Sequence, residues 1–221
     1  MSNWVIAIDG PAGAGKSTVA KLLAHRLGLR YLDTGAMYRA LALKVTRSHV
    51  SVADEPGIAE IARDLDVHFG EGDPQTVWLG AEDISESIRT PEIGELASAL
   101  SAYPSVRRHL VARQQSMIHE GGYTLEGRDT TTVVAKDADL KVFLTASLEE
   151  RAKRRHKELQ ERGIEIDYDE LLRQISQRDH RDYTRDESPL SIAKDALRIE
   201  SFGVSPETIV EQIIAALRRK V

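Results

Sequence analysis

Residues 10–17 read Gly-Pro-Ala-Gly-Ala-Gly-Lys-Ser and fit the pattern G-x-x-x-x-G-K-[ST], which is typical of a loop that binds phosphate groups. Its glycines let the backbone curl until the N–H groups converge on phosphate oxygens, and the N-terminus of a following helix adds a favourable dipole. Lys16 can bring a mobile positive charge to the β- and γ-phosphates, and the Ser17 hydroxyl can bind Mg²⁺. The motif therefore predicts a site for ATP or GTP.

The sequence on either side of this motif supplies the elements that must position it. Residues 4–8 form a short apolar run rich in β-branched side chains, as in a buried parallel strand. Residues 16–27 carry apolar side chains at helical spacing, and Gly28 is suited to end that helix. A glycine-rich turn can match the motif by chance, but a strand before it and a helix after it are the context that the motif requires.

A row of charged residues near the end of the chain could also handle phosphates. Four of them fall at helical positions i, i+3, i+4 and i+7 and so share one helix face: Arg178, Arg181, Asp182 and Arg185. Such a run is usually a solvated helix face. Phosphoryl transfer, however, requires guanidinium groups that hold the equatorial oxygens while charge redistributes. From the residues alone, both interpretations stay open.

Other arginines offer two further candidates for phosphate contacts. Arg39 lies one turn into a predicted helix, where it could clamp a monophosphate or simply be solvated. Arg151, Arg154 and Arg155 could form a cluster on a mobile element, because residues 157–163 are polar enough for a lid.

The predicted elements follow the order of an α/β protein with a parallel sheet. Its expected strands are residues 4–8, 29–32, 123–125, 139–145 and 196–200, with helices between them. Residues 65–69 and 76–79 instead read as an antiparallel hairpin, which indicates an insertion at about 64–100. We therefore expect a three-layer P-loop NTPase-type fold with a central parallel five-stranded sheet.

Composition restricts the class of protein further. The chain of 221 residues has a size suited to one domain, and its net charge of −5 disfavours a protein made mainly for nucleic acid or anionic membranes. It has no cysteine and no apolar run long enough to span a membrane, so we expect an unexported, cytoplasmic protein without disulfides.

Several motifs, in order along the chain, carry a resemblance to a known family. They are Gly-Pro-Ala-Gly-Ala-Gly-Lys-Ser-Thr at 10–18, Leu-Asp-Thr-Gly-Ala-Met-Tyr-Arg at 32–39, Ile-Arg-Thr-Pro-Glu at 88–92, Glu-Gly-Arg-Asp-Thr-Thr-Thr-Val-Val at 126–134 and Arg-Asp-His-Arg-Asp-Tyr-Thr-Arg at 178–185. Together they resemble bacterial-type cytidylate kinase over essentially the whole chain. The first motif is shared by many families, whereas the other four in combination are specific. The resemblance implies transfer of the ATP γ-phosphate to CMP or dCMP, with Mg²⁺ as cofactor. We also expect a monomer.

The same resemblance implies roles for individual residues. Those implied for CMP are Thr34, Tyr38, Arg39, Ser98, Arg107, Arg128, Asp129, Arg178, Asp182 and Arg185. Those implied for ATP are Gly10, Pro11, Ala12, Gly13, Ala14, Gly15, Lys16, Ser17, Thr18 and Arg155. The implied catalytic residues are Lys16, Arg128, Arg178 and Arg185, and the implied metal ligand is Ser17. Ser98, Arg107 and Asp129 would meet the cytosine edge, where a carboxylate can accept from the 4-amino group that uracil lacks.

The resemblance also divides the single domain, residues 1–221, into functional parts. It implies a core over 1–63 and 101–221, a monophosphate-binding insertion at about 64–100 and a lid at about 151–165. The chain departs from the commoner family form, which is Asp-Gly-Arg-Asp followed closely by Gly, at Glu126 and Thr131. Thr131 would restrict the loop if a positive φ were required there.

Two alternatives differ in class or substrate. A kinase of the same fold could act on UMP, AMP or a non-nucleotide, but Ser98, Arg107 and Asp129 would then have no reason to coincide. A P-loop ATPase switch or binding module is less favoured. Its GTPase form would need an Asn-Lys-x-Asp motif, and the only asparagine is Asn3.

Overall fold

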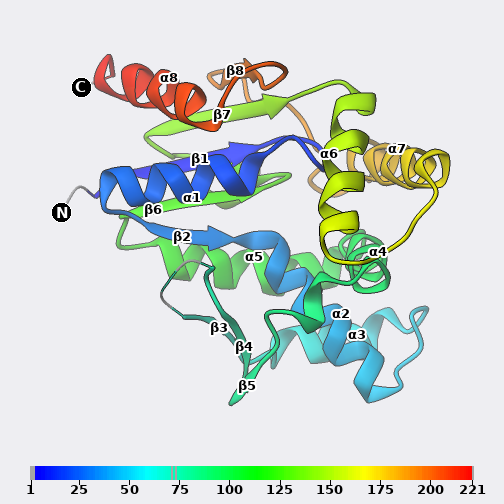
Figure 1. The fold of residues 1–221 in the computed structure, drawn as a ribbon. Helices are drawn as coiled ribbons and strands as arrows, with labels where there is room; N and C mark the ends of the chain where they lie inside the picture. Colours follow the sequence, from blue (N-terminus) through cyan, green and yellow to red (C-terminus); the bar gives the residue numbers. More distant parts are fainter. Residues whose placement is uncertain (1–2, 71, 73, 221) are drawn as a thin grey trace. The chain divides into compact units, whose positions relative to one another are not determined.

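The structure of the protein, a computed structural model, describes residues 3–70, 72 and 74–220. Residues 71 and 73 of the expected insertion lie outside the described residues. A five-stranded sheet has the strand order β2-β6-β1-β7-β8, with β1 in the centre (Figure 1). The strands are β1 Val5–Asp9, β2 Arg30–Asp33, β6 Tyr123–Gly127, β7 Leu140–Thr145 and β8 Leu197–Glu200. The parallel α/β fold predicted from the sequence is confirmed.

The register between β1 and β6 brings two distant parts of the chain level with each other. β1 pairs in parallel with β6 from Val5 opposite Tyr123 to Asp9 opposite Gly127. β6 is thus two residues longer than expected, because pairing with β1 continues through Glu126 and Gly127. As a result, the start of the phosphate-binding loop at Gly10 lies beside the start of the segment that carries Arg128.

The chain forms two compact units, one made of Met1–Tyr31 with Glu120–Val221 and the other of Leu32–His119. In the first unit, α1 Lys16–Leu27 and α8 Pro206–Arg218 pack side by side against the sheet, and α6 Leu148–Glu161 packs against α7 Tyr168–Thr184. Gly28 ends α1 at a φ of 65°, as the sequence predicts. The Ser147 hydroxyl accepts from the Glu150 amide at the start of α6.

The second unit is mainly helical and contains α2 Thr34–Ser48, α3 Glu55–Arg63, the 3₁₀ turn η1 Ser87–Arg89, α4 Pro91–Leu100 and α5 Pro104–Ile118. It also contains an antiparallel sheet of β3 Val67–Phe69, β4 Val77–Leu79 and β5 Glu82–Asp83. The predicted hairpin is confirmed by the pairing of β3 with β4. The hydrophobic periodicity did not single out α4, although Thr90 caps it and Pro91 occupies its first turn.

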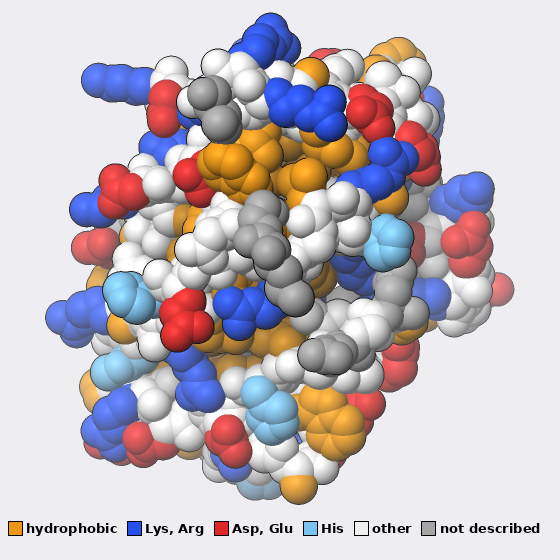
Figure 2. All heavy atoms as spheres, turned by 90° about the vertical axis from the view of Figure 1, so that its left-hand side faces the viewer, with side chains coloured by type: hydrophobic (Ala, Val, Ile, Leu, Met, Phe, Trp, Pro, Cys, Tyr) orange, Lys and Arg blue, Asp and Glu red, His pale blue; other side chains and the backbone are white. Residues whose placement is uncertain are grey.

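On the face drawn in Figure 2, Lys and Arg side chains are interspersed with Asp and Glu, and neither sign gathers into one field. Among the described residues, no helix has both the length and the apolarity needed to cross a bilayer.

Candidate active site

The phosphate-binding loop joins β1 to α1 and contains three glycines with positive φ, namely Gly10, Gly13 and Gly15. Gly10 has a φ of 152°, and a Cβ atom there would overlap the backbone carbonyl of Leu144 in β7. Gly15 has a φ of 91° and stands at the N-cap of α1, where a left-handed conformation is required. The loop therefore presents its backbone at the carboxyl end of the central strand, which is where open parallel sheets bind ligands.

Lys16 is nearly removed from water, with an exposed fraction of 5%. Its Nζ donates a hydrogen bond to the carbonyl of Pro11 at 2.8 Å, across the loop. Burial lowers the pKa of Lys16 to about 7, and the nearby charges of Arg128 and Arg178 also lower it. The charged form of Lys16 is therefore disfavoured in the absence of an anion, and a bound phosphate would stabilise it.

The first turn of α1 carries two hydroxyl side chains, and a carboxylate lies at the end of β6. Ser17 and Thr18 are exposed in that turn. Glu126 is buried at the end of β6 and accepts a hydrogen bond from the Tyr31 hydroxyl at 2.6 Å; its charge acts on Lys16. Mg²⁺ in such sites takes one or two protein oxygens and completes its shell with phosphate and water, so this hydroxyl and carboxylate suit it.

Two arginines of α6 hold the loop from its outer side. Arg151 donates to the carbonyl of Ala12 at 3.0 Å and forms an ion pair of 2.6 Å with Asp179 of α7. Arg154 donates to Ser201, and the Ser201 hydroxyl donates to the carbonyl of Ala14 at 3.0 Å. Sequence reasoning placed these arginines in a cluster on a mobile element, but it did not foresee that they bind loop carbonyls.

Arg155, which the family resemblance assigns to ATP, lies on another side of α6. It forms an ion pair of 2.7 Å with Glu158, one turn further along the helix. The Arg155 side chain remains about one-third exposed.

A buried cluster of opposite charges forms where β6 meets α7. The Arg128 Nε donates to Asp182 at 2.9 Å, and Arg185 lies 3.9 Å from Asp182 and 3.8 Å from Asp129. Burial raises the pKa of Asp182, but the charges of Arg128, Arg178 and Arg185 outweigh it, and the pKa lies below its usual value. The predicted row does not lie wholly on one helix, because α7 ends at Thr184 and Arg185 follows it in extended backbone. The side chains of Asp182 and Arg185 are buried, so this part of the row is not a solvated face.

The segment after Asp129 forms a π-helical turn, η2 Thr130–Val134, that sequence reasoning did not foresee. Thr131 is not among the described non-glycine residues with positive φ, which are His49 and Ser188. Its substitution for the commoner glycine therefore carries no left-handed strain. The carboxylate that accepts hydrogen bonds from this turn is Asp9, which lies between the predicted strand at 4–8 and the phosphate-binding loop and which sequence reasoning did not mark.

In the second unit, Asp33 fixes the start of α2. Its side chain accepts from the Ala36 amide at 2.9 Å and from Arg39 at 2.7 Å. Burial raises the pKa of Asp33, but the charge and hydrogen bond of Arg39 lower it by more. The pKa therefore lies below its usual value, and the group stays ionised. Arg39 is thus held one turn into the helix, near Thr34 at its N-terminus.

Three more predicted residues meet in the same unit. The Arg107 guanidinium lies 5.6 Å from the centre of the Tyr38 ring and donates to the carbonyl of Ser101 at 3.1 Å. The Ser101 hydroxyl donates to the carbonyl of Ser98 at 2.8 Å. The structure therefore brings Tyr38, Ser98 and Arg107 together from three helices, and adds Ser101, which the sequence did not mark.

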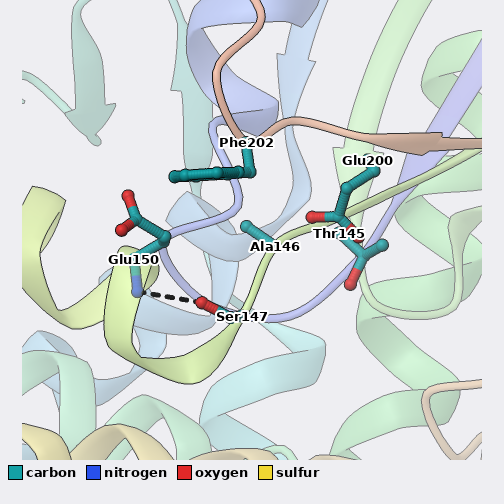
Figure 3. A pocket seen from close by; sticks show the side chains of 6 residues that line it. All are labelled: Thr145, Ala146, Ser147, Glu150, Glu200 and Phe202. Carbon is teal, nitrogen blue, oxygen red and sulfur yellow. Dashed lines mark hydrogen bonds between the residues drawn. The ribbon is translucent and has the colours of Figure 1, made fainter.

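A hollow of about 510 Å³ lies at the carboxyl ends of β7 and β8 (Figure 3). It is lined by Thr145, Ala146, Ser147, Glu150, Glu200 and Phe202. The Phe202 ring faces Ala146 and is 61% exposed, so an aromatic surface is open to a planar ligand. Ser201, next to Phe202, touches the phosphate-binding loop, which places the hollow beside it.

The central strand of the parallel sheet leads directly into the glycine loop, and a buried lysine and an arginine cluster lie beside that loop. These features define a P-loop nucleotide-binding protein. Comparison with known proteins narrows the class. The family model described as cytidylate kinase matches residues 6–219. The chain belongs to the cytidylate kinase family.

Individual relatives agree with this assignment. A protein of Caldanaerobacter subterraneus subsp. tengcongensis described as cytidylate kinase is 49% identical over 214 residues, covering 97% of this chain and 94% of its own length. One from Carboxydothermus hydrogenoformans with the same description is 45% identical over 216 residues, covering 97% of both chains. The fold also resembles the solved structure of a gluconokinase from Sinorhizobium meliloti 1021, with a TM-score of 0.53, 14% identity and coverage of 98% of this chain and 93% of that one.

Proposed function

We propose that this chain is an ATP-dependent nucleoside monophosphate kinase that transfers the γ-phosphate of ATP to CMP or dCMP, giving ADP and CDP or dCDP. The observation that carries the reaction is the buried cluster of Arg128, Asp129, Asp182 and Arg185 in the same unit as the phosphate-binding loop. Membership of the cytidylate kinase family carries the choice of acceptor.

The donor nucleotide is assigned to the first unit. Backbone N–H groups of residues 10–18 would hold its phosphates, Lys16 would neutralise the β- and γ-phosphates, and Arg155 would contribute a further positive charge. Mg²⁺, bound through Ser17 and phosphate oxygens, would offset charge on the transferred group. The hollow beside Phe202 offers the donor base an aromatic surface.

Transfer itself requires little covalent chemistry from the protein. A phosphate oxygen of CMP attacks the γ-phosphorus in line, and the bond to the β–γ bridging oxygen breaks, so that ADP leaves. Arg128, Arg178 and Arg185 are assigned to the equatorial oxygens of the transferred group, where their charge stabilises the transition state.

The residues assigned to the acceptor are those of the family motifs outside the phosphate-binding loop. Thr34, Tyr38 and Arg39 suit its phosphate, because a hydroxyl, a phenol and a guanidinium lie on the first turns of α2. Ser98, Arg107 and Asp129 are assigned to the cytosine edge, and Arg178, Asp182 and Arg185 to the sugar and phosphate. We further assign about 64–100 to monophosphate binding, 1–63 and 101–221 to the core and about 151–165 to a lid, in a cytoplasmic monomer.

A coupled assay of ADP release with CMP, dCMP, UMP and AMP tests the substrate. We expect CMP and dCMP to be used fastest. If ATP were consumed no faster with either of them than with UMP or AMP, a kinase with another acceptor would be the better description.

Asp129→Ala removes the acceptor assigned to the cytosine 4-amino group. It should lower kcat/KM for CMP by about 100-fold, since a site built on one hydrogen bond discriminates strongly, while the Kd for ATP changes little. Asp137→Ala is the matched control, because Asp137 is exposed a short distance along the same segment. Loss of ATP affinity with unchanged CMP preference would contradict the assignment.

A further inference from the structure

Asp9 is a fully buried carboxylate that none of the steps above uses. It is the last residue of β1 and immediately precedes Gly10 of the phosphate-binding loop. Burial raises the pKa of Asp9 above its usual value, and hydrogen bonds from Thr131 and Thr130 offset part of that rise. A carboxylate is costly in such a place unless hydrogen bonds satisfy it.

Those hydrogen bonds come from two adjacent threonines more than 100 residues away in the sequence. Asp9 Oδ1 accepts from the Thr130 amide at 2.9 Å and from its hydroxyl at 2.7 Å. Asp9 Oδ2 accepts from the Thr131 amide at 2.7 Å and from its hydroxyl at 2.6 Å. Each carboxylate oxygen thus receives one backbone and one side-chain donor.

This arrangement requires an aspartate. An asparagine would turn its amide nitrogen toward one of the backbone N–H groups, which can only donate. A glutamate would be one methylene too long for the site. Thr131 supplies a hydroxyl that a glycine, the commoner residue at this place in the family pattern, could not provide.

The contact links the two parts of the site that must work together. On one side, Asp9 is covalently joined to Gly10 and the loop. On the other, Thr130 directly follows Arg128 and Asp129, and the carbonyl of Asp129 accepts from Val133 and Val134 in the π-helical turn. A π-helical turn is a rare feature that often marks a functional site.

We propose that Asp9, through the Thr130 and Thr131 hydroxyls and amides, is a positioning residue that holds the Arg128–Asp129 segment in register with the phosphate-binding loop. The inference rests on the proposed kinase function. Loosening the link should leave the loop able to bind ATP, because Lys16 and the backbone N–H groups are unchanged. It should reduce turnover, because Arg128 would meet the transferred phosphate less often in the productive geometry.

Thr131→Val and Thr132→Val form a matched pair that tests the link. Both remove a buried hydroxyl from neighbouring residues of one turn, but the Thr132 hydroxyl has no hydrogen-bond partner among the described residues. Thr131→Val should lower kcat with CMP about tenfold relative to Thr132→Val, with the Kd for ATP within about twofold of the wild type. Thr131→Ser, which keeps the hydroxyl, should restore kcat.

The outcomes separate this inference from the proposed function. The wild type is assayed first, and absence of CMP turnover there would reject the kinase assignment itself. Given an active wild type, equal kcat in Thr131→Val and Thr132→Val would overturn the positioning role, as would a parallel loss of kcat and ATP affinity. If Thr131→Val fails to fold, Thr130→Ser and Thr130→Ala, which differ only in the hydroxyl, give the same comparison at the other carboxylate oxygen.

Discussion

Lys16 shows how a single residue can be prepared for an anion by its surroundings. Burial disfavours its charge and lowers its pKa to about 7, so above that pH much of the nucleotide-free protein carries a neutral lysine. Nucleotide phosphates would bring the opposite charge to within contact and raise the pKa again. Binding and protonation at this residue are therefore linked.

Nucleotide binding should accordingly take up protons, and the sign follows from the lowered pKa. Below about pH 6 the lysine is already charged in the free protein, so little uptake is expected; near pH 8 uptake should approach one proton per ADP. Calorimetry of ADP binding in buffers of different ionisation enthalpy measures this number. Lys16→Arg keeps the positive charge but does not titrate in this pH range, so it is the control; uptake that is equal at both pH values would contradict the linkage.

At the scale of an element, the loop between β1 and α1 is shaped by what lies against it. Gly10 approaches the backbone of Leu144 in β7, and Arg151 and Arg154 of α6 hold the loop carbonyls. A backbone neighbour cannot rotate away as a side chain can. The loop conformation is therefore a property of three elements together.

Gly10→Ala tests this and is matched by Gly28→Ala. Both glycines have positive φ, but only at Gly10 would the new methyl group meet another backbone; nothing lies within 4 Å of the Cβ position at Gly28. Gly28→Ala should cost about 1 kcal/mol of stability and leave ADP affinity unchanged. Gly10→Ala should weaken ADP binding by at least about tenfold, through overpacking of 1–3 kcal/mol or more; wild-type affinity in a titration would contradict it.

On the scale of the whole molecule, the groups assigned to the two substrates are divided between two compact units. The phosphate-binding loop and the Arg128 cluster belong to the first, whereas Thr34, Tyr38, Arg39, Ser98 and Arg107 belong to the second. Each unit has its own hydrophobic core. The stability of the first unit should therefore depend on ADP.

At about 100 times its Kd, ADP should add about 2.7 kcal/mol to the free energy of unfolding, because it binds only the folded loop. For a chain of this size that corresponds to a rise in Tm of about 5–10 °C, measured by scanning calorimetry. If the units unfold separately, the transition of the first should move. The shift should disappear in Lys16→Ala, and an unchanged wild-type Tm at saturating ADP would refute the assignment.

The sequence by itself determined the local features. The spacing of Gly10, Gly15 and Lys16 identified the phosphate-binding loop, alternation identified the hairpin of β3 and β4, and Gly28 marked a helix end. These features are predictable because periodicity, capping and turn chemistry act over a few residues. The family motifs supplied the candidate residues for both substrates.

The tertiary structure decided which distant side chains meet and which of them lose water. The hydrogen bonds from Thr130 and Thr131 to Asp9 and the contact of Arg128 with Asp182 join residues that are far apart in the chain. The lowered pKa of Lys16 likewise depends on burial and on the charges of distant residues. No local pattern encodes them, because the energy of a buried charge depends on its partners and its desolvation, and both are set only when the strands and helices pack.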